Sequence, residues 1–278
     1  MVWGLMWYPY RVLQGEGVSA GLATLLSYAL ALLLGVLMLG PVWREWRVAG
    51  WWGICLTLSA GWTNLGYVLA VLGGEVMRVL LLFYLAPLWT VVLARVLLGE
   101  KTDRYGYAVI ALSLGGVFVM LWHPRLGLPV PQNAGEWIGL SAGLTFALTN
   151  VLVRRTQHLS VTFKSASVWF GTTLLTLPLM LYQGQLAGEL RAVSPFAWLL
   201  LALLGLVLCA TSLVAQHGLT YLPANQSIIL FLSELVIAAV SSYLLANEVM
   251  GQREIIGATL IVSASLLSGK IRAAPEKA

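Results

Sequence analysis

The chain has 278 residues, of which 59% are hydrophobic and only 10% are charged, with a net charge of +5. A soluble domain carries roughly 25% charged residues, so this composition cannot cover a water-facing surface and indicates an integral membrane protein. In a soluble protein the positive charge would be compatible with nucleic-acid binding, but basic residues in membrane loops explain it better, and no nucleic-acid partner is expected.

Ten apolar segments follow along the chain, most of them close to the ~20 residues that a helix needs to cross a bilayer. They predict an all-α integral membrane protein with ten transmembrane helices, at residues 3–13, 18–40, 49–72, 75–99, 105–122, 134–153, 163–182, 195–219, 223–246 and 253–269. The first segment is short, so either the natural N-terminus lies upstream or this helix is broken at Pro9. Cys55 and Cys209 stand alone in apolar segments, which favours small buried side chains over a disulfide or a metal site.

A weak internal repeat relates two of these segments. Residues 79–100 form a long apolar run that ends in a charged turn, and residues 228–248 have the same layout, although few letters are identical. Aligning the two runs places Phe83 on Phe231 and Glu100 on Glu248. Internal symmetry of this kind is typical of many transporters. With the proline-rich loop 123–133 as the divider, we predict two five-helix repeats, residues 1–128 and 129–278.

The basic residues indicate the orientation. With the N-terminus in the cytoplasm, the cytoplasmic segments hold eleven of the sixteen Lys and Arg residues: Arg44, Arg47, Arg95, Lys101, Arg104, Arg154, Arg155, Lys164, Lys270, Arg272 and Lys277. The positive-inside rule therefore predicts both termini in the cytoplasm, and we expect a bacterial inner membrane. Because each repeat has an odd number of helices, the second repeat is inverted relative to the first.

One short motif matches the GxSxG pattern of serine hydrolases, with Ser141 between Gly139 and Gly143. That motif requires a strand, a sharp turn and a helix to expose the serine, whereas this copy lies within an apolar span where the hydroxyl can bond its own backbone. The two glycines are better explained as a close-packing site for a neighbouring helix. Neither a zinc-protease motif nor a nucleotide-binding loop occurs, and no cofactor or metal is expected.

An acidic residue, Glu234, lies in the middle of the ninth predicted span. A carboxylate at that depth costs ~2.5 kcal/mol or more on insertion scales, so it should face the bundle interior or a wet cavity. Ser227, Glu234 and Ser241 recur every seven residues and share one helix stripe. Two interpretations stay open. Glu234 lines a cavity, where it binds a substrate ammonium group or senses protons, or it is a protonated side chain bonded to another helix.

Other polar and aromatic residues inside the spans are candidates to line a cavity. The candidate substrate-binding set is Trp3, Trp7, Asn64, Tyr67, Tyr84, Trp89, Phe146, Asn150, Ser212, Gln216 and Glu234. The amides and hydroxyls can hydrogen-bond polar groups, and the aromatic rings can stack a flat ligand or hold a cation. The alternatives are hydrogen bonds between helices and packing against lipid. Pro87 removes a backbone hydrogen bond in the fourth span and is a candidate hinge.

Three local patterns then point to a family. They are the Trp3-Gly4 opening, the fourth span with Leu85 and Pro87 followed by Gly99-Glu100, and the turn 221–224, YLPA. Together they resemble the EamA type of the drug/metabolite transporter superfamily. Within it, the tryptophan-rich first span and the segment 232–242, LSELVIAAVSS, look most like bacterial aromatic amino acid exporters. Leu235 stands where the second half of the family usually has proline, which argues against a symmetric kink in the ninth helix.

The resemblance implies a 5+5 inverted repeat around a central cavity lined by helices 1, 3, 4, 6, 8 and 9. It also implies an inner-membrane secondary transporter, not an enzyme, that exports aromatic or amphipathic amino acids and related small metabolites by alternating access. The alternatives are a drug/metabolite transporter for another small solute, such as a cationic drug or a purine, and an intramembrane hydrolase. Proton coupling, the exact substrates and a homo-oligomeric state stay open.

Overall fold

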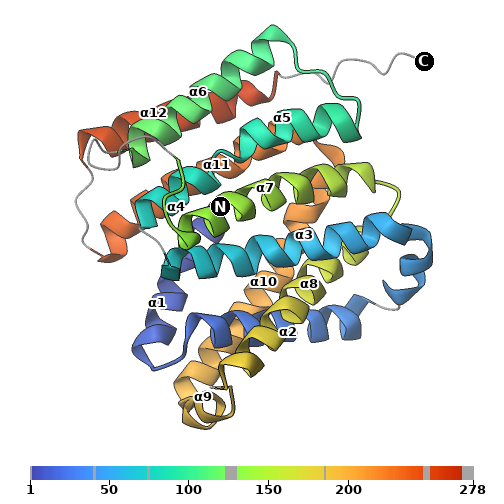
Figure 1. Ribbon diagram of the computed structural model, residues 1–278, viewed down its shortest axis with the longest axis vertical. Coiled ribbons are helices and arrows are strands. Elements are labelled where there is room, and N and C mark those ends of the chain that lie inside the picture. Colours follow the sequence, from blue (N-terminus) through green and yellow to red (C-terminus); the bar gives the residue numbers. More distant parts are fainter. Residues whose placement is uncertain are drawn as a thin grey trace.

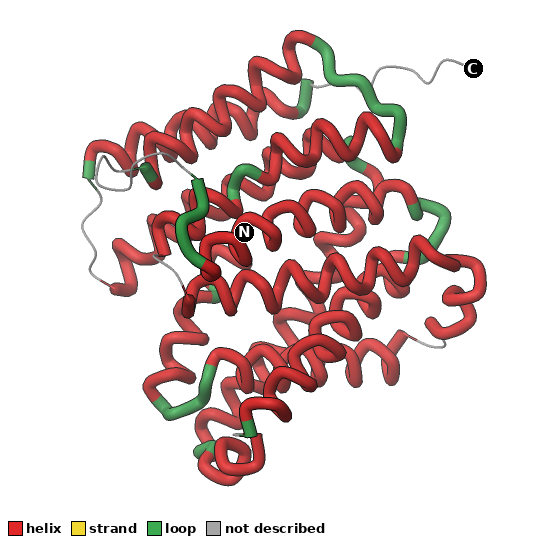
Figure 2. The backbone as a smooth tube through the Cα atoms, viewed as in Figure 1, coloured by secondary structure: helices red, strands yellow, loops and turns green. Residues whose placement is uncertain are grey.

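The computed structural model describes residues 2–39, 42–73, 76–122, 130–184, 186–246 and 251–270. Within these ranges every segment is a helix or a connecting loop (Figure 2). The elements are η1 Trp3–Leu5, α1 Trp7–Gly15, α2 Ala20–Leu39, η2 Val42–Glu45, α3 Trp46–Gly73, α4 Val76–Phe83, α5 Ala86–Leu97, α6 Arg104–Leu121, α7 Ala134–Arg155, α8 Val161–Gln183, α9 Leu186–Ala192, α10 Pro195–Tyr221, α11 Ala224–Ala246 and α12 Gln252–Ser268. The prediction of an all-helical protein is confirmed for this part of the chain.

Eight stretches of the described chain are long and apolar enough to cross a membrane. They are Ala20–Leu37, Trp46–Val71, Arg78–Leu97, Arg104–Leu121, Ala134–Arg155, Val161–Gln183, Pro195–Tyr221 and Ala224–Leu245. The two remaining predicted spans correspond to the short pair η1 and α1 and to α12, which has 17 residues. A multi-pass membrane protein is therefore supported, while the count of ten spans stays a prediction.

The first predicted span is divided, but not at the proline. The chain forms a 3-10 turn, η1, and then starts α1 at Trp7, with Met6 between them. Pro9 lies in the first turn of α1, where backbone N–H groups have no partner within the helix and a proline is tolerated. The expectation of a break at Pro9 is therefore wrong, because a proline this close to a helix start removes no helical hydrogen bond.

The fourth predicted span is broken next to its proline. Helix α4 ends at Phe83 and α5 begins at Ala86, with Pro87 in the first turn of α5. The leucine before this turn, Leu85, adopts a helical φ of −72° with ψ near −1°, which tightens the turn between the two helices. The expected interruption is present, and it lies on the N-terminal side of Pro87 because a proline favours the start of a helix over its interior.

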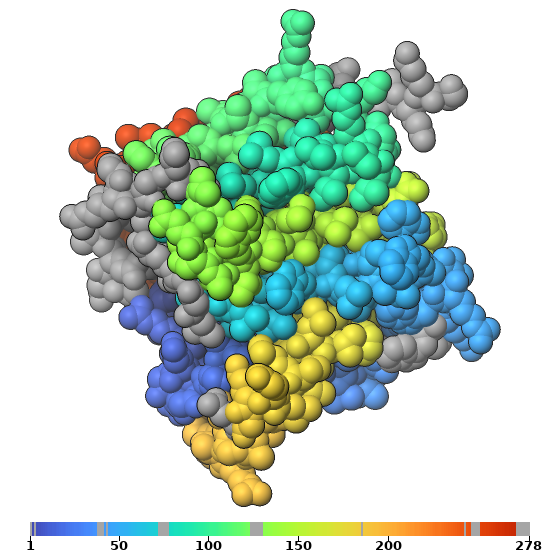
Figure 3. Space-filling model, viewed as in Figure 1, coloured from blue at the N-terminus to red at the C-terminus, as the bar shows by residue number. Residues whose placement is uncertain are grey.

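The helices form a bundle with α3 and α7 across its middle (Figure 1). On one side α6 and α12 lie against each other, and α4, α5 and α11 connect this pair to α7. On the other side α2, α8 and α10 pack together. Side chains fill the space between the helices on the viewed face (Figure 3). Residues far apart in sequence thus meet in the centre, around α7.

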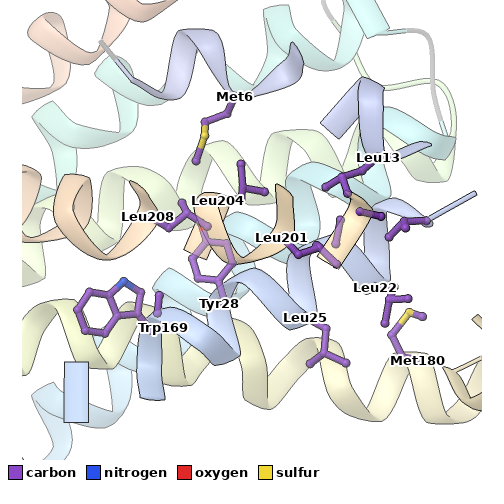
Figure 4. Close-up of a cluster of buried hydrophobic side chains, with 14 of the residues drawn as sticks. Met6, Leu13, Leu22, Leu25, Tyr28, Trp169, Met180, Leu201, Leu204 and Leu208 are labelled. Carbon is purple, nitrogen blue, oxygen red and sulfur yellow. The ribbon is translucent and has the colours of Figure 1, made fainter. Parts of the chain in front are cut away.

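The lower part of the bundle is held by apolar side chains from α1, α2, α8 and α10 (Figure 4). Leu13, Leu22 and Trp169 are fully buried there, and Met180 and Leu208 are only 1% exposed. Apolar side chains gain little by leaving lipid for a protein interior, so in a bilayer such helices associate mainly through close packing. This cluster therefore holds α1, α2, α8 and α10 together on one side of the central helices.

A row of polar contacts joins α3 to α7. Each contact pairs one side chain from α3 with one from α7: Trp62 Nε1 to Ser141 Oγ at 3.0 Å, Thr63 Oγ1 to Thr145 Oγ1 at 3.1 Å, and Thr149 Oγ1 to Ser59 Oγ at 3.0 Å. The paired positions run in opposite directions along the two helices, so α3 and α7 are antiparallel. Hydrogen bonds between membrane helices of this kind fix the register of neighbours.

Candidate functional site

The centre of the bundle holds a group of rings that we call the aromatic cluster: Tyr67, Phe83, Tyr84, Phe146 and Phe231. Phe146 of α7 stacks on Phe83 of α4, with ring centroids 5.4 Å apart and an interplanar angle of 21°. The ring of Phe231 from α11 meets Phe146 edge-on at 5.4 Å. Tyr67 and Tyr84 contact Phe83 at 5.3 and 5.4 Å. Four helices therefore contribute to one aromatic wall.

A glycine on α7 makes this arrangement possible. A Cβ atom on Gly143 would lie 2.5 Å from the carbonyl oxygen of Phe83, so only glycine lets the α4 backbone approach so closely. Gly139, one turn earlier, packs less tightly against α4, because a Cβ there would lie 3.1 Å from Cγ1 of Val79 and 3.5 Å from its backbone oxygen. The prediction that these two glycines form a close-packing site for another helix is confirmed. The approach brings the Phe83 ring beside Phe146, one turn further along α7.

Glu234 lies on α11 three residues after Phe231, on the same side of the helix. Its carboxyl group is close enough to Tyr84 to interact with it electrostatically, as is the hydroxyl of Tyr67. The predicted stripe on α11 faces the interior at both ends, since Ser227 and Ser241 are buried. A carboxyl group thus borders the aromatic cluster, which itself contains the phenols of Tyr67 and Tyr84.

The first turn of the chain packs over this part of α11. A Cβ on Gly4 would lie 2.5 Å from the backbone oxygen of Glu234, so η1 rests directly on the helix. Trp7 Nε1 donates a hydrogen bond to Ser241 Oγ at 2.9 Å. The side chain of Trp7 is therefore bound to α11 by a hydrogen bond. The side chain of Trp3 lies outside the described part of the structure.

A second group, polar and buried, lies between α7 and α10; we call it the amide group, comprising Asn150, Ser212 and Gln216. These side chains are 1%, 2% and 5% exposed. Asn150 Oδ1 and Nδ2, Ser212 Oγ and Gln216 Oε1 have no hydrogen-bond partner within the described protein. Leaving such groups unpaired costs about 1 to 3 kcal/mol each, which favours a role in binding a polar ligand.

The register of the two helices brings the amide group together. Arg154 Nη1 of α7 donates to the backbone oxygen of Thr220 in α10 at 2.8 Å. One turn before these residues lie Asn150 on α7 and Gln216 on α10, and Ser212 is one further turn back. Because both helices run in the same direction, Asn150 and Gln216 occupy the same level of the α7–α10 interface.

Two of the candidate residues are engaged elsewhere. Asn64 Oδ1 accepts a hydrogen bond from the Tyr28 hydroxyl at 2.7 Å, and its Nδ2 donates to the Ala60 carbonyl at 2.9 Å. Its amide thus links α3 to α2, as the alternative of a bond between helices anticipated. Trp89 packs against a separate apolar cluster that includes Ile228, and it makes no ring contact with the aromatic cluster among the described residues.

Each end of α7 carries an arginine–glutamate pair. At its start, Glu136 Oε1 lies 2.9 Å from Arg78 Nε of α4, and both side chains are buried. At its end, Arg154 Nε lies 3.8 Å from Oε1 of Glu100, just after α5. Burial raises the pKa of Glu100 above its ordinary value, although nearby Arg154 and the backbone N–H of Ala224 act in the opposite direction. The α4–α5 segment and α7 are therefore connected at both ends of the bundle.

Lys164, one of the basic residues predicted on the cytoplasmic side, has its side chain inside the protein. It lies in the first turn of α8, is fully buried, and donates from Nζ to Thr220 Oγ1 at 2.9 Å. Arg154 bonds the backbone of the same threonine, so two cations from different helices converge on α10. Its burial was not predicted, because hydropathy near a span end does not reveal which side chains turn inward.

Several site residues were not among the sequence candidates. Phe83 and Phe231 are two of them, although their alignment in the internal repeat was a signal that could have identified them. Arg78 and Glu136 are others, since charged residues near span ends are usually taken for loop residues. Glu248, the repeat partner of Glu100, lies outside the described residues.

The hydrolase alternative finds little support in the geometry of Ser141. Its hydroxyl donates to the Ile138 carbonyl at 2.7 Å and accepts from Trp62 Nε1 at 3.0 Å. The residue lies inside α7, with no strand or sharp turn beside it. A serine held in this way joins two helices and is not presented as a nucleophile.

Membrane-spanning helices that enclose aromatic, amide and carboxyl side chains are common among multi-pass membrane transporters. Residues 133–269 match the EamA-like transporter family. An uncharacterized transporter of Archaeoglobus fulgidus is 27% identical over 207 residues, 74% of this chain and 72% of that protein. A crystal structure with 17% sequence identity superimposes with a TM-score of 0.72 over 95% of this chain and 94% of its own, which shows a shared fold. The second half of the chain is thus similar to the EamA-like transporter family, and the whole chain shares the fold of a solved structure.

Proposed function

We propose that the protein is a secondary transporter that exports aromatic or other amphipathic amino acids by alternating access. The observation that carries this proposal is the position of Phe146 and Asn150, one turn apart on the same side of α7. Phe146 belongs to the aromatic cluster, and Asn150 is buried with an unpaired amide. An amphipathic solute can place its ring against the first and its polar end against the second.

In this proposal each group of residues has a distinct role. The aromatic cluster binds the side chain of the substrate by stacking and edge contacts. The amide group binds the carboxylate, since amide N–H and hydroxyl groups donate to anions. Glu234 binds the ammonium group, with Tyr84 near it. Pro87 and the break before it provide the hinge through which α4 moves relative to α5.

The inverted repeat is supported by the pattern of contacts. Phe83 and Phe231, equivalent in the sequence repeat, contact Phe146 from two helices. Helix α3 packs on α8 while α10 packs on α2, and α4 packs on α7 while η1 packs on α11. If each helix is replaced by its equivalent in the other repeat, the α3–α8 contact becomes the α10–α2 contact. The α4–α7 contact likewise becomes the contact between α11 and η1. Such exchange symmetry is the basis of alternating access in inverted-repeat transporters.

We further propose a bacterial inner membrane with both chain ends in the cytoplasm, in accordance with the positive-inside rule. Reporter fusions at each end test this orientation. Cytoplasmic signals from both fusions are expected, and signals from opposite sides would overturn the inverted repeat.

The transport proposal is tested by flux into proteoliposomes. Purified protein should move labelled tryptophan, phenylalanine or tyrosine faster than empty vesicles do, with and without an imposed pH gradient. The same panel includes a purine and a cationic dye, so faster movement of either would replace the amino acid assignment with another solute. If none of them crosses faster than in empty vesicles, the proposal fails.

A matched pair of variants tests the site. Ser212→Ala removes a buried hydroxyl of the amide group, while Thr211→Val changes the adjacent residue, whose hydroxyl bonds its own helix at Val207. Losing a hydrogen bond to a charged ligand group corresponds to about 1.5 to 3 kcal/mol, so Ser212→Ala should raise the half-saturating substrate concentration about tenfold or more. Thr211→Val should leave it unchanged. Equal behaviour of the two variants would remove the amide group from the site.

A further inference from the structure

A pocket of about 260 Å³ opens where α5 ends and α6 begins, away from the aromatic cluster. Its lining residues are Val91, Arg95, Glu100, Lys101, Thr102 and Tyr107. Five of the six lining residues carry a polar or charged group, and the sixth, Val91, is an apolar residue of α5. None of these six residues belongs to the aromatic cluster or to the amide group.

The pocket presents donors and positive charge. Arg95 and Lys101 are exposed, and neither forms an ion pair within the described part of the chain. The carboxylate of Glu100 is turned toward Arg154 and the backbone N–H of Ala224, and its side chain is only 12% exposed. Thr102 Oγ1 accepts from Asn225 Nδ2 at 3.0 Å, which leaves its own proton available to donate. Together these groups suit an anion with several oxygen atoms.

The surroundings point to a lipid as the source of that anion. Leu88, Val92 and Val96 form a stripe on the outer side of α5, and they are 48%, 56% and 74% exposed. On a membrane-spanning helix such an exposed apolar stripe faces acyl chains. Arg95 lies in the last turn of the same helix, near the end of the apolar stretch Arg78–Leu97, and Tyr107 of the pocket lining is 46% exposed.

We propose that this pocket binds the phosphate headgroup of an anionic phospholipid. The two cations and two hydroxyl groups contact the phosphate oxygens, and the acyl chains lie along the α5 stripe. Basic pockets between membrane helices are a known form of headgroup recognition. The pocket also adjoins α11, since Thr102 bonds Asn225 in the first turn of that helix. A bound lipid therefore stabilises the contact between the α5–α6 loop and the start of α11.

Native mass spectrometry of the detergent-purified full chain tests this proposal. Phosphatidylglycerol and phosphatidylcholine with the same acyl chains are offered in equal amounts, and the wild type should retain the anionic lipid preferentially. The variant Arg95→Gln/Lys101→Gln removes two positive charges, and each charge contributes about fivefold to the affinity for an anionic lipid. The preference of this variant for phosphatidylglycerol over phosphatidylcholine should therefore fall by roughly 25-fold. The conservative variant Arg95→Lys/Lys101→Arg keeps both charges and should retain most of the preference.

The matched control is Arg44→Gln/Arg47→Gln, which removes two exposed cations near the start of α3. It should bind phosphatidylglycerol as the wild type does. Equal loss in the control, or no loss in the Arg95→Gln/Lys101→Gln variant with unchanged elution and helix content, would overturn the assignment. Inorganic phosphate and glycerol phosphate are added in separate arms. Full displacement of the lipid by either at millimolar concentration would identify a site for soluble phosphate compounds and also overturn it.

Discussion

The two ends of α7 are each joined to the α4–α5 segment by an arginine–glutamate pair, but the pairs differ in burial and geometry. Arg78 and Glu136 meet at 2.9 Å with side chains 7% and 2% exposed. Arg154 and Glu100 are 3.8 Å apart, with side chains 26% and 12% exposed. The first pair is a buried hydrogen-bonded contact, whereas the second is a longer contact near the surface.

The hydrogen bonds around each pair extend this difference. Glu136 also accepts from the backbone N–H of Gln132 and from Asn133 Nδ2, and Arg78 donates to the Val130 carbonyl. At the other end Arg154 makes its short hydrogen bonds to Gln157 and Thr220, while its contact with Glu100 is the longest. A buried pair with its other hydrogen bonds completed resists separation more than a partly exposed one. If α7 separates from the α4–α5 segment, breaking the Arg154–Glu100 contact should therefore cost less free energy than breaking the Arg78–Glu136 contact.

The largest effect is expected from breaking the buried pair. Arg78→Met leaves the Glu136 carboxylate buried without its cation, which corresponds to a loss of about 3 to 5 kcal/mol of stability. Unfolding of the purified variant in mixed detergent, followed by circular dichroism, measures it. The double variant Arg78→Met/Glu136→Leu should recover most of the loss, because two apolar side chains replace both charges. A loss below about 1 kcal/mol in the single variant would show that the two ends of α7 are equivalent.

An intermediate effect is expected midway between the two pairs. Gly143→Ala puts a methyl group against the Phe83 backbone, where a Cβ would lie 2.5 Å from the carbonyl oxygen. Forcing the helices apart should cost about 1 to 3 kcal/mol and lower the melting temperature. Gly115→Ala on α6 is the matched control, since nothing lies within 4 Å of the Cβ position there. Equal behaviour of the two variants would mean that α4 and α7 separate freely between their ends.

The sequence predicted the helices well because a membrane span needs a long apolar run, and such runs are visible without knowledge of their neighbours. The observed helix boundaries differ from the predicted ones mainly where one residue type is compatible with two local structures. Pro9 illustrates this, since a proline breaks a helix interior but is accepted in a first turn. The short helix α9 was also not expected, because its residues resemble a polar loop.

The candidate site was predicted less completely, since it depends on which sides of different helices meet. Tyr67, Tyr84 and Phe146 do converge, yet Phe83, which contacts all three, is marked in the sequence only by its alignment with Phe231 in the internal repeat. Asn64 was equally plausible as a binding residue until its bond to Tyr28 was known. An amide in an apolar span indicates a hydrogen bond but does not reveal the partner.

The smallest effect is expected at the exposed end of α7, and its pH dependence sharpens the comparison. Burial raises the pKa of Glu100, with Arg154 and the Ala224 N–H opposing the rise. A carboxyl group whose pKa is raised by folding contributes stability that is present below the ordinary Glu value of about 4.3 and is lost as the pH rises through the folded-state pKa. The melting temperature of the wild type should therefore fall relative to that of Glu100→Gln between about pH 4 and 7. At pH 7 the free energies of unfolding of the two proteins should differ by less than about 1 kcal/mol. If the melting temperature of the wild type instead rises relative to that of Glu100→Gln as the pH increases, attraction to Arg154 outweighs the effect of burial on Glu100. The ion pair would then stabilise the Arg154 end of α7, as the Arg78–Glu136 pair stabilises the other end.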